Sequence, residues 1–169
     1  MGLRLGTNAA VAAAAAACLC APASAATVNA QAKAKVVKPL AIESRQNLDL
    51  GTIVLGPGTW SAATVRLSRT GVLTCPASVT CSGATQVAIY NIAGSNGQTI
   101  VISVPDVNLV NQGNAAKTLT LVPDAQQTVQ LTNSGNPGTN VAIGGAITID
   151  STTADGVYSG TFNVTADYQ

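Results

Sequence analysis

The sequence predicts an all-β fold, an antiparallel β-sandwich. Strand-like apolar segments recur about every 8 to 14 residues, with turn-forming residues between them. No segment after residue 25 keeps a helical period over three turns, so the crossover helices of a parallel α/β sheet are missing. Aromatic residues make up only 3% of the chain, so we expect an aliphatic core.

The amino terminus predicts a secretory signal peptide over residues 1–25, followed by a single β-sandwich domain over residues 26–169. Arg4 supplies the positive charge, residues 9–20 form an apolar run, and Ala23-Ser24-Ala25 fits the small-x-small cleavage pattern. The run is shorter than the roughly 20 residues of a transmembrane helix, and we expect no transmembrane segment. The protein is therefore expected in the periplasm, at the cell surface or outside the cell.

The charge balance argues against a polyanionic partner. After residue 25 the basic and acidic residues are equal in number, and the chain has no histidine. A surface with so little charge does not attract nucleic acid, so we expect no nucleic-acid partner.

Two cysteines remain after the signal peptide, Cys75 and Cys81. An exported protein meets an oxidising environment, so a disulfide between them is expected. In the chain-entropy model, a disulfide that closes such a short loop stabilises the folded state by roughly 2 to 2.5 kcal/mol. We expect the bond to staple the tip of a hairpin.

The segment from Val28 to Val36 shows the cleanest alternation in the chain, and we call it the arm. Polar Asn29, Gln31, Lys33 and Lys35 separate its apolar residues, and Pro39 ends the pattern. The arm is either a strand donated to another copy or the first strand of its own sandwich. The apolar positions are Val28, Ala30, Ala32, Ala34 and Val36.

Further strands follow in order along the chain. A hairpin-type turn at residues 94–97 is expected to join two of them, residues 108–116 are expected to form a loop, and Pro123 to end a strand. Gly144-Gly145 predicts a bulge or a close backbone contact. The expected strands include residues 52–55, 64–68, 87–93, 100–104, 119–121, 129–131 and 141–149.

The closing segment, residues 156–169, alternates to the penultimate residue. Its even-numbered face is expected to be buried, and the strand to be built into a sheet because free chain ends fray. An aromatic next to the end and a glycine 14 residues from the end resemble the carboxy-terminal motif of chaperone–usher pilus subunits. The simpler alternative is the last core strand of any secreted sandwich. The resemblance implies a chaperone and assembly strand with Gly156, Tyr158, Phe162, Val164 and Tyr168.

Several phrases together resemble a family of secreted bacterial domains of unknown function, the one numbered 4402. They are LDLGTIVLGPG, VAIYNIAG with IVISVP, VAIGGAITID and GVYSGTFNVTADY, and the resemblance extends over about Val28 to Gln169. It implies an immunoglobulin-like sandwich related to fimbrial and spore-coat-U-type subunits, pilin-like with a donated strand. The family has no established catalytic residues to carry over to this chain.

The residue inventory does not favour an enzyme. Without histidine, the Ser-His-Asp and Cys-His arrangements are impossible, and no clustered ligands predict a metal or another cofactor. Asp150 and Asp155 flank one loop and could in principle form a carboxylate pair. Aspartates in such loops are far more often turn formers, which is the interpretation we adopt.

The sequence therefore predicts a non-enzymatic structural subunit of a surface fibre or coat, assembled by strand donation. Its expected partners are copies of itself and a periplasmic chaperone. The alternative is a secreted or surface-attached monomeric domain that binds a partner or a glycan.

We predict that the exported protein begins at Ala26 or Thr27, because cleavage after Ala25 or Ala26 fits the small-x-small pattern. Amino-terminal sequencing of the protein from fractionated cells checks this. Recovery of Met1 in a membrane fraction would contradict it.

Overall fold

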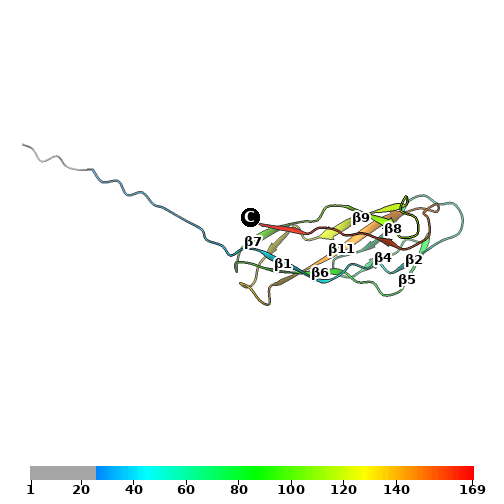
Figure 1. Ribbon diagram of the computed structural model, residues 1–169, viewed down its shortest axis with the longest axis horizontal. Coiled ribbons are helices and arrows are strands. Elements are labelled where there is room, and N and C mark those ends of the chain that lie inside the picture. The colour runs from blue at the N-terminus through cyan, green and yellow to red at the C-terminus, as the bar shows by residue number, and fades with distance from the viewer. Residues whose placement is uncertain (1–25) are drawn as a thin grey trace, which may run out of the picture. The chain divides into compact units, whose positions relative to one another are not determined.

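The computed structural model describes residues 26–169, and the predicted signal peptide lies outside the described residues. Every regular element described is a β-strand, as Figure 1 shows. The strands are β1 (Ala41–Gln46), β2 (Thr52–Leu55), β3 (Ala63–Leu67), β4 (Leu73–Thr74), β5 (Val79–Ser82), β6 (Ala88–Ala93), β7 (Thr99–Ser103), β8 (Val107–Asn111), β9 (Thr118–Ala125), β10 (Thr128–Gln130), β11 (Thr139–Ile149), β12 (Tyr158–Ser159) and β13 (Thr165–Tyr168).

All strand pairs are antiparallel, which confirms the predicted fold class. The largest sheet has the order β1-β6-β11-β9-β8-β12, with β3 pairing β11 and β4 pairing β3. A second sheet has the order β10-β7-β13, and β2 pairs with β5 in a third. The chain divides into compact units after residue 35, so residues 36–169 form the domain described below.

Two aliphatic clusters fill the domain. Val65, Val79, Leu121, Ile147 and Ile149 form the first, with Phe162 among the partly buried side chains packed against it. The second cluster joins the other sheet to the first, and its members are Ile92, Ile100, Ile102, Leu131 and Val141. The scarcity of aromatic residues thus leads to a core of branched aliphatic side chains, as predicted.

Strand β11 is the longest, and its partner on one side changes at Gly144-Gly145. Before this pair β11 joins β6, after it β11 joins β3, and β9 lies along the other side. A Cβ on Gly144 would collide with the Leu67 carbonyl and lie 2.5 Å from the Ser68 carbonyl carbon. The double glycine is therefore a close backbone contact, one of the two predicted alternatives.

The turn at residues 94–97 does not make a hairpin, and this prediction was wrong. Strand β6 pairs with β1 and β11, whereas β7 pairs with β10 and β13, so the turn crosses between sheets. Ile92 and Ile100 are both fully buried in the second cluster, so the two strands contribute to one core from different sheets. Gly94 permits the crossing, since a Cβ there would lie 2.7 Å from a methyl carbon of Leu131.

Two other local expectations were wrong. Residues 107–111 form β8, because Val107 and Leu109 pack into the first cluster and pair with β9. Strand β9 continues through Pro123. Pro123 pairs with β11 on one side, and β8 does not extend along β9 as far as this residue on the other. The backbone N–H that proline lacks is therefore not needed, because that edge of β9 is free.

The predicted disulfide between Cys75 and Cys81 is present, with a Cα–Cα distance of 6.1 Å. It does not staple a hairpin tip, because β4 pairs with β3 while β5 pairs with β2. The bond therefore connects the small β2-β5 sheet to the chain leaving β4, and Cys81 packs against the first cluster.

We predict that Gly144→Ala lowers the free energy of unfolding by about 1–3 kcal/mol, because the new methyl group overlaps the backbone of residues 67 and 68. Urea denaturation of the mature protein measures the change. Gly113→Ala is the matched control: its Cβ would meet only Asn111 Oδ1, at 3.4 Å. Equal effects of the two substitutions would contradict the close-contact interpretation.

Candidate assembly groove

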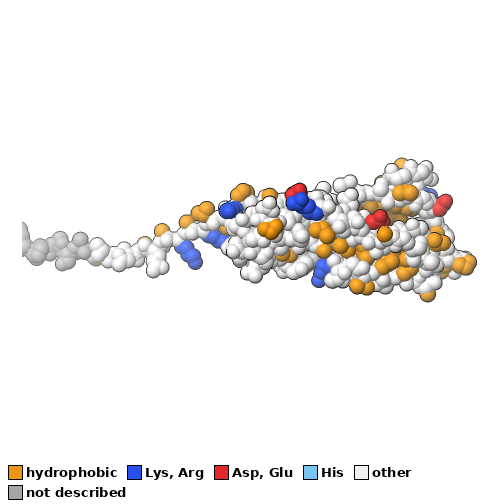
Figure 2. Space-filling view, turned by 90° about the horizontal axis from the view of Figure 1, so that it is seen from below, with side chains coloured by type: hydrophobic (Ala, Val, Ile, Leu, Met, Phe, Trp, Pro, Cys, Tyr) orange, Lys and Arg blue, Asp and Glu red, His pale blue; other side chains and the backbone are white. Residues whose placement is uncertain are grey.

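An open groove of about 740 Å³ lies against the first core cluster. Its two walls are residues 48–55, which include β2, and residues 153–162, which include β12. The core residues Leu121, Ile147 and Ile149 also line it, so the groove opens directly onto the core. Figure 2 shows hydrophobic side chains gathered toward the right-hand end of the domain, with few charged side chains among them.

Among residues 26–169, both walls have an edge without a partner strand. Within this part of the chain β2 pairs with β5 alone, and β12 pairs with β8 alone. Residues 160–164, between β12 and β13, belong to no strand. The groove is therefore flanked by backbone that could accept one further strand.

The first part of the predicted assembly strand lines this groove, through Gly156, Tyr158 and Phe162. Val164 and Tyr168 do not line it and pack against the second cluster instead. Tyr158, Phe162, Val164 and Tyr168 are half-buried, whereas the odd-numbered residues between them are exposed. The predicted alternation is thus correct, but the inward side chains are less buried than expected and the segment splits into two short strands, β12 and β13.

Gly156 begins this segment and has a specific structural role. Its φ is +135°, and a Cβ would lie 2.5 Å from Asn111 Nδ2. Asn111 is the buried polar residue among those described; it donates to the Asp155 carbonyl and accepts from the backbone N–H groups of Gly113 and Asn114. Because glycine has no side chain, the closing segment can pass next to the Asn111 amide, which is buried and hydrogen-bonded.

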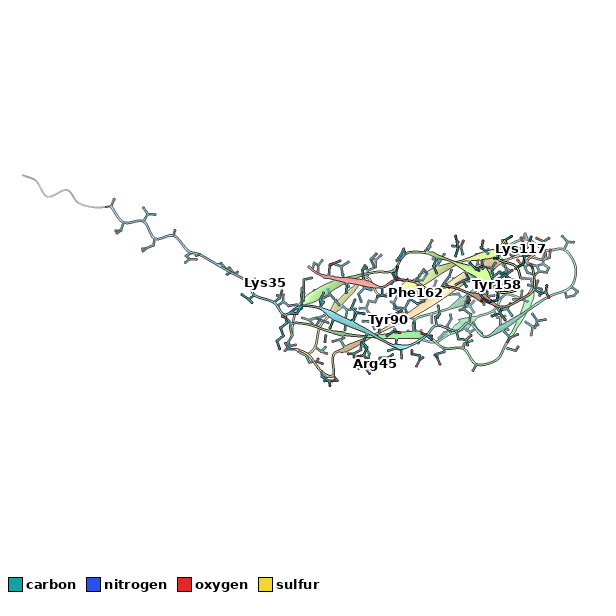
Figure 3. The ribbon with its side chains drawn as sticks, in the orientation of Figure 1. Lys35, Arg45, Tyr90, Lys117, Tyr158 and Phe162 are labelled. Carbon is teal, nitrogen blue, oxygen red and sulfur yellow. A yellow bond between two sulfur atoms is a disulfide. The ribbon has the colours of Figure 1, made fainter. Side chains whose placement is uncertain are left out.

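Phe162 contributes an aromatic side chain to the wall. Its ring centroid lies 6.2 Å from that of Tyr90 on β6, with an interplanar angle of 57°. Figure 3 shows both residues, with Phe162 and Tyr158 on the same closing segment. Phe162 thus packs the closing segment against β6.

Tyr168 ties the closing segment to Lys38, near the start of the domain. Its hydroxyl donates to the Lys38 carbonyl at 2.7 Å and accepts from Ser95 N–H at 2.7 Å. Lys38 N–H donates to Ser95 Oγ at 2.6 Å, which closes a three-residue ring of hydrogen bonds. The root of the arm is therefore attached to the last strand.

The arm itself belongs to no strand, and residues 26–39 are exposed. Val28 and Val36 are 91% and 93% exposed. The first strand of the described domain is β1, which begins at Ala41. Donation of the arm to another copy and pairing of the arm within its own sandwich both stay predictions.

Sequence reasoning did not identify residues 48–55 as part of a site. The signal was present: Leu48, Leu50, Ile53 and Leu55 are half-buried at the groove, while Thr52 and Val54 are exposed. Their role becomes visible only when the closing segment is placed opposite them.

Asp150 acts as a turn former near one end of the groove. Its Oδ1 accepts hydrogen bonds from the backbone N–H and hydroxyl of Thr152, both at 2.8 Å, and from the Thr153 hydroxyl at 3.2 Å. These bonds, with the Thr152 hydroxyl first, hold the pKa of Asp150 below its ordinary value. The predicted turn role agrees with this geometry.

Another carboxylate, Asp124, lies outside the groove. Burial raises its pKa, but hydrogen bonds from Arg66 and from the backbone of Arg69 outweigh this effect, so the pKa lies below its ordinary value. The two guanidinium groups lie 2.8 and 3.2 Å from its oxygens, and the cluster ties β3 to β9.

Within residues 26–169, no group of three or more histidine, cysteine or acidic side chains is arranged to hold a metal ion. The same residues contain no helix with the length and apolar character needed to cross a membrane.

The fold and the site together define the class of this protein as an antiparallel all-β domain with an open apolar groove. Residues 40–168 match the family model described as Domain of unknown function (DUF4402), and the chain belongs to this family. The matched region begins after the arm, so the arm lies outside it. Comparisons with curated proteins and with solved structures gave no match.

We predict that Phe162→Ala lowers the free energy of unfolding by about 2 kcal/mol, less than the roughly 3–5 kcal/mol for a fully buried ring. Asn163→Ala, on the exposed face next to it, is the control and should stay within about 0.5 kcal/mol of the wild type. Thermal and urea denaturation measure both. Equal small effects would mean that the register of the closing segment is wrong.

Proposed function

We propose that this protein is a non-enzymatic, exported structural subunit of a surface fibre or coat, assembled by strand donation. The observation that carries the proposal is the open apolar groove in a domain whose own alternating arm is unpaired and exposed. In this mechanism the arm of one copy occupies the groove of the next.

The groove needs an occupant on physical grounds. Core side chains such as Leu121 and Ile149 line an open volume, and the wall edges carry unpaired backbone groups. Exposed apolar surface beside free strand edges is a site of association or aggregation. A strand inserted there would cover the apolar lining and supply backbone hydrogen-bond partners at once.

The arm is long enough to extend along β2. An extended strand rises about 3.3 Å per residue, so the nine residues of the arm span about 30 Å, which is more than the length of β2 in the groove wall, about 13 Å. The alternation would direct the alanines and the two terminal valines of the arm inward. Because alanine buries little apolar area, backbone hydrogen bonds would contribute much of the affinity.

This function implies export and a periplasmic chaperone. The predicted signal peptide would bring the chain to an oxidising compartment, where the disulfide at Cys75 and Cys81 forms. The open groove would be covered by a chaperone strand until a neighbour's arm replaces it. Asp150 was one member of the possible carboxylate pair in the sequence. In the structure it makes turn hydrogen bonds, and this supports a non-enzymatic role.

The test is Ala32→Asp in the mature protein, which should abolish assembly because it places a charge in the apolar groove without a partner. Gln31→Asp, which places the same charge on the outward face of the arm, is the matched control and should be tolerated much better. Size-exclusion chromatography with light scattering measures the polymer. A wild-type protein that stays monomeric and fully folded at high concentration would overturn strand donation and favour a monomeric binding domain.

A further inference from the structure

Charge is divided unequally between the arm and the rest of the protein. The arm carries Lys33 and Lys35 and no acidic residue. Residues 37–169 carry five basic and seven acidic residues, a formal charge of about −2 that balances the arm. The acidic residues are Glu43, Asp49, Asp106, Asp124, Asp150, Asp155 and Asp167, and the basic ones are Lys38, Arg45, Arg66, Arg69 and Lys117.

The groove shows the same asymmetry. The charged residues that line it are Asp49 on one wall and Asp155 on the other, and both are exposed. No lysine or arginine is among the described residues of its lining. The Asp150 carboxylate lies in the turn next to the lining residue Thr153, and the hydrogen bond from the Thr152 hydroxyl holds its pKa below the ordinary value.

The alternation of the arm decides where its charges would lie. With Ala32 and Ala34 directed into the groove, Lys33 and Lys35 point outward, next to the walls. Lysine side chains are long enough to lay their methylenes along apolar surface while the ammonium group reaches the rim. A basic arm then meets an acidic rim, whereas an acidic segment would be repelled.

We propose that the acidic rim of the groove, Asp49 and Asp155, selects and steers the basic arm of a second copy through Lys33 and Lys35. This inference rests on the proposed strand donation and names the feature by which the groove recognises its occupant. Pairs at an exposed rim add little to final affinity, but complementary charge accelerates encounter and suppresses wrong partners.

The experiment follows the rate of polymer formation by the mature protein with light scattering, at low and at high salt. Lys33→Gln/Lys35→Gln neutralises the arm, and Asp49→Asn/Asp155→Asn neutralises the rim. Asparagine can still accept the Gly51 N–H that Asp49 binds at 2.8 Å, so the turn is kept. Each pair should slow assembly about tenfold at low salt and remove most of the salt dependence.

Combining the two pairs distinguishes a specific interaction from a general charge effect. If the lysines act through these aspartates, the fourfold variant should assemble no more slowly than either double variant. Asp106→Asn/Asp167→Asn is the matched control, since both residues are exposed and lie outside the groove lining, and it should leave the rate nearly unchanged.

The outcomes separate this inference from the proposed function. Fully additive slowing in the fourfold variant, or equal slowing by the control pair, would overturn electrostatic selection. Wild-type assembly that is indifferent to salt and to neutralisation would also overturn it while strand donation stands. Absence of any wild-type polymer would instead overturn the proposed function.

Discussion

The close contact at Gly144-Gly145 is the constraint on which the rest of the domain depends. Strand β11 touches β6, β3 and β9, and it can change from β6 to β3 only because no side chain separates it from the backbone at Leu67. The change of partner brings β3 and its neighbour β4 onto the large sheet. The first core cluster, which the groove exposes, contains residues of both β11 and β3.

Local patterns predicted most of the strands but not their partners. The alternation in residues 64–68 and 141–149 identified β3 and β11, because side chains on one face of a strand are buried together. Strand β8 was missed because its three apolar residues, Val107, Leu109 and Val110, lie beside two asparagines and do not alternate strictly. Which sheet a strand joins is decided by contacts far apart in sequence, such as those that gather Ile92, Leu131 and Val141 into one cluster, and no local pattern encodes them.

The candidate site was predicted only in part, because local patterns do not show which segments lie opposite each other. The closing segment and the arm were identified because alternation at two chain ends is visible in a single stretch of sequence. The opposite wall, residues 48–55, was not, because a groove is a relation between two segments and Leu48 gains its role only from the segment that faces it. The need for glycine at position 156 likewise depends on the buried amide of Asn111, which lies far away in sequence.

The hydrogen-bond ring of Tyr168, Lys38 and Ser95 has a mechanical consequence. In a polymer formed by strand donation, the segment that flanks the received strand ends at Tyr168, and the hydroxyl of this tyrosine holds the root of the strand given to the next copy. Tension from the donated strand would enter the domain along the covalent chain into β1 and, in parallel, through this ring into the closing segment. The load would thus be divided between β1, which pairs with β6 in the large sheet, and the closing segment, which flanks the received strand.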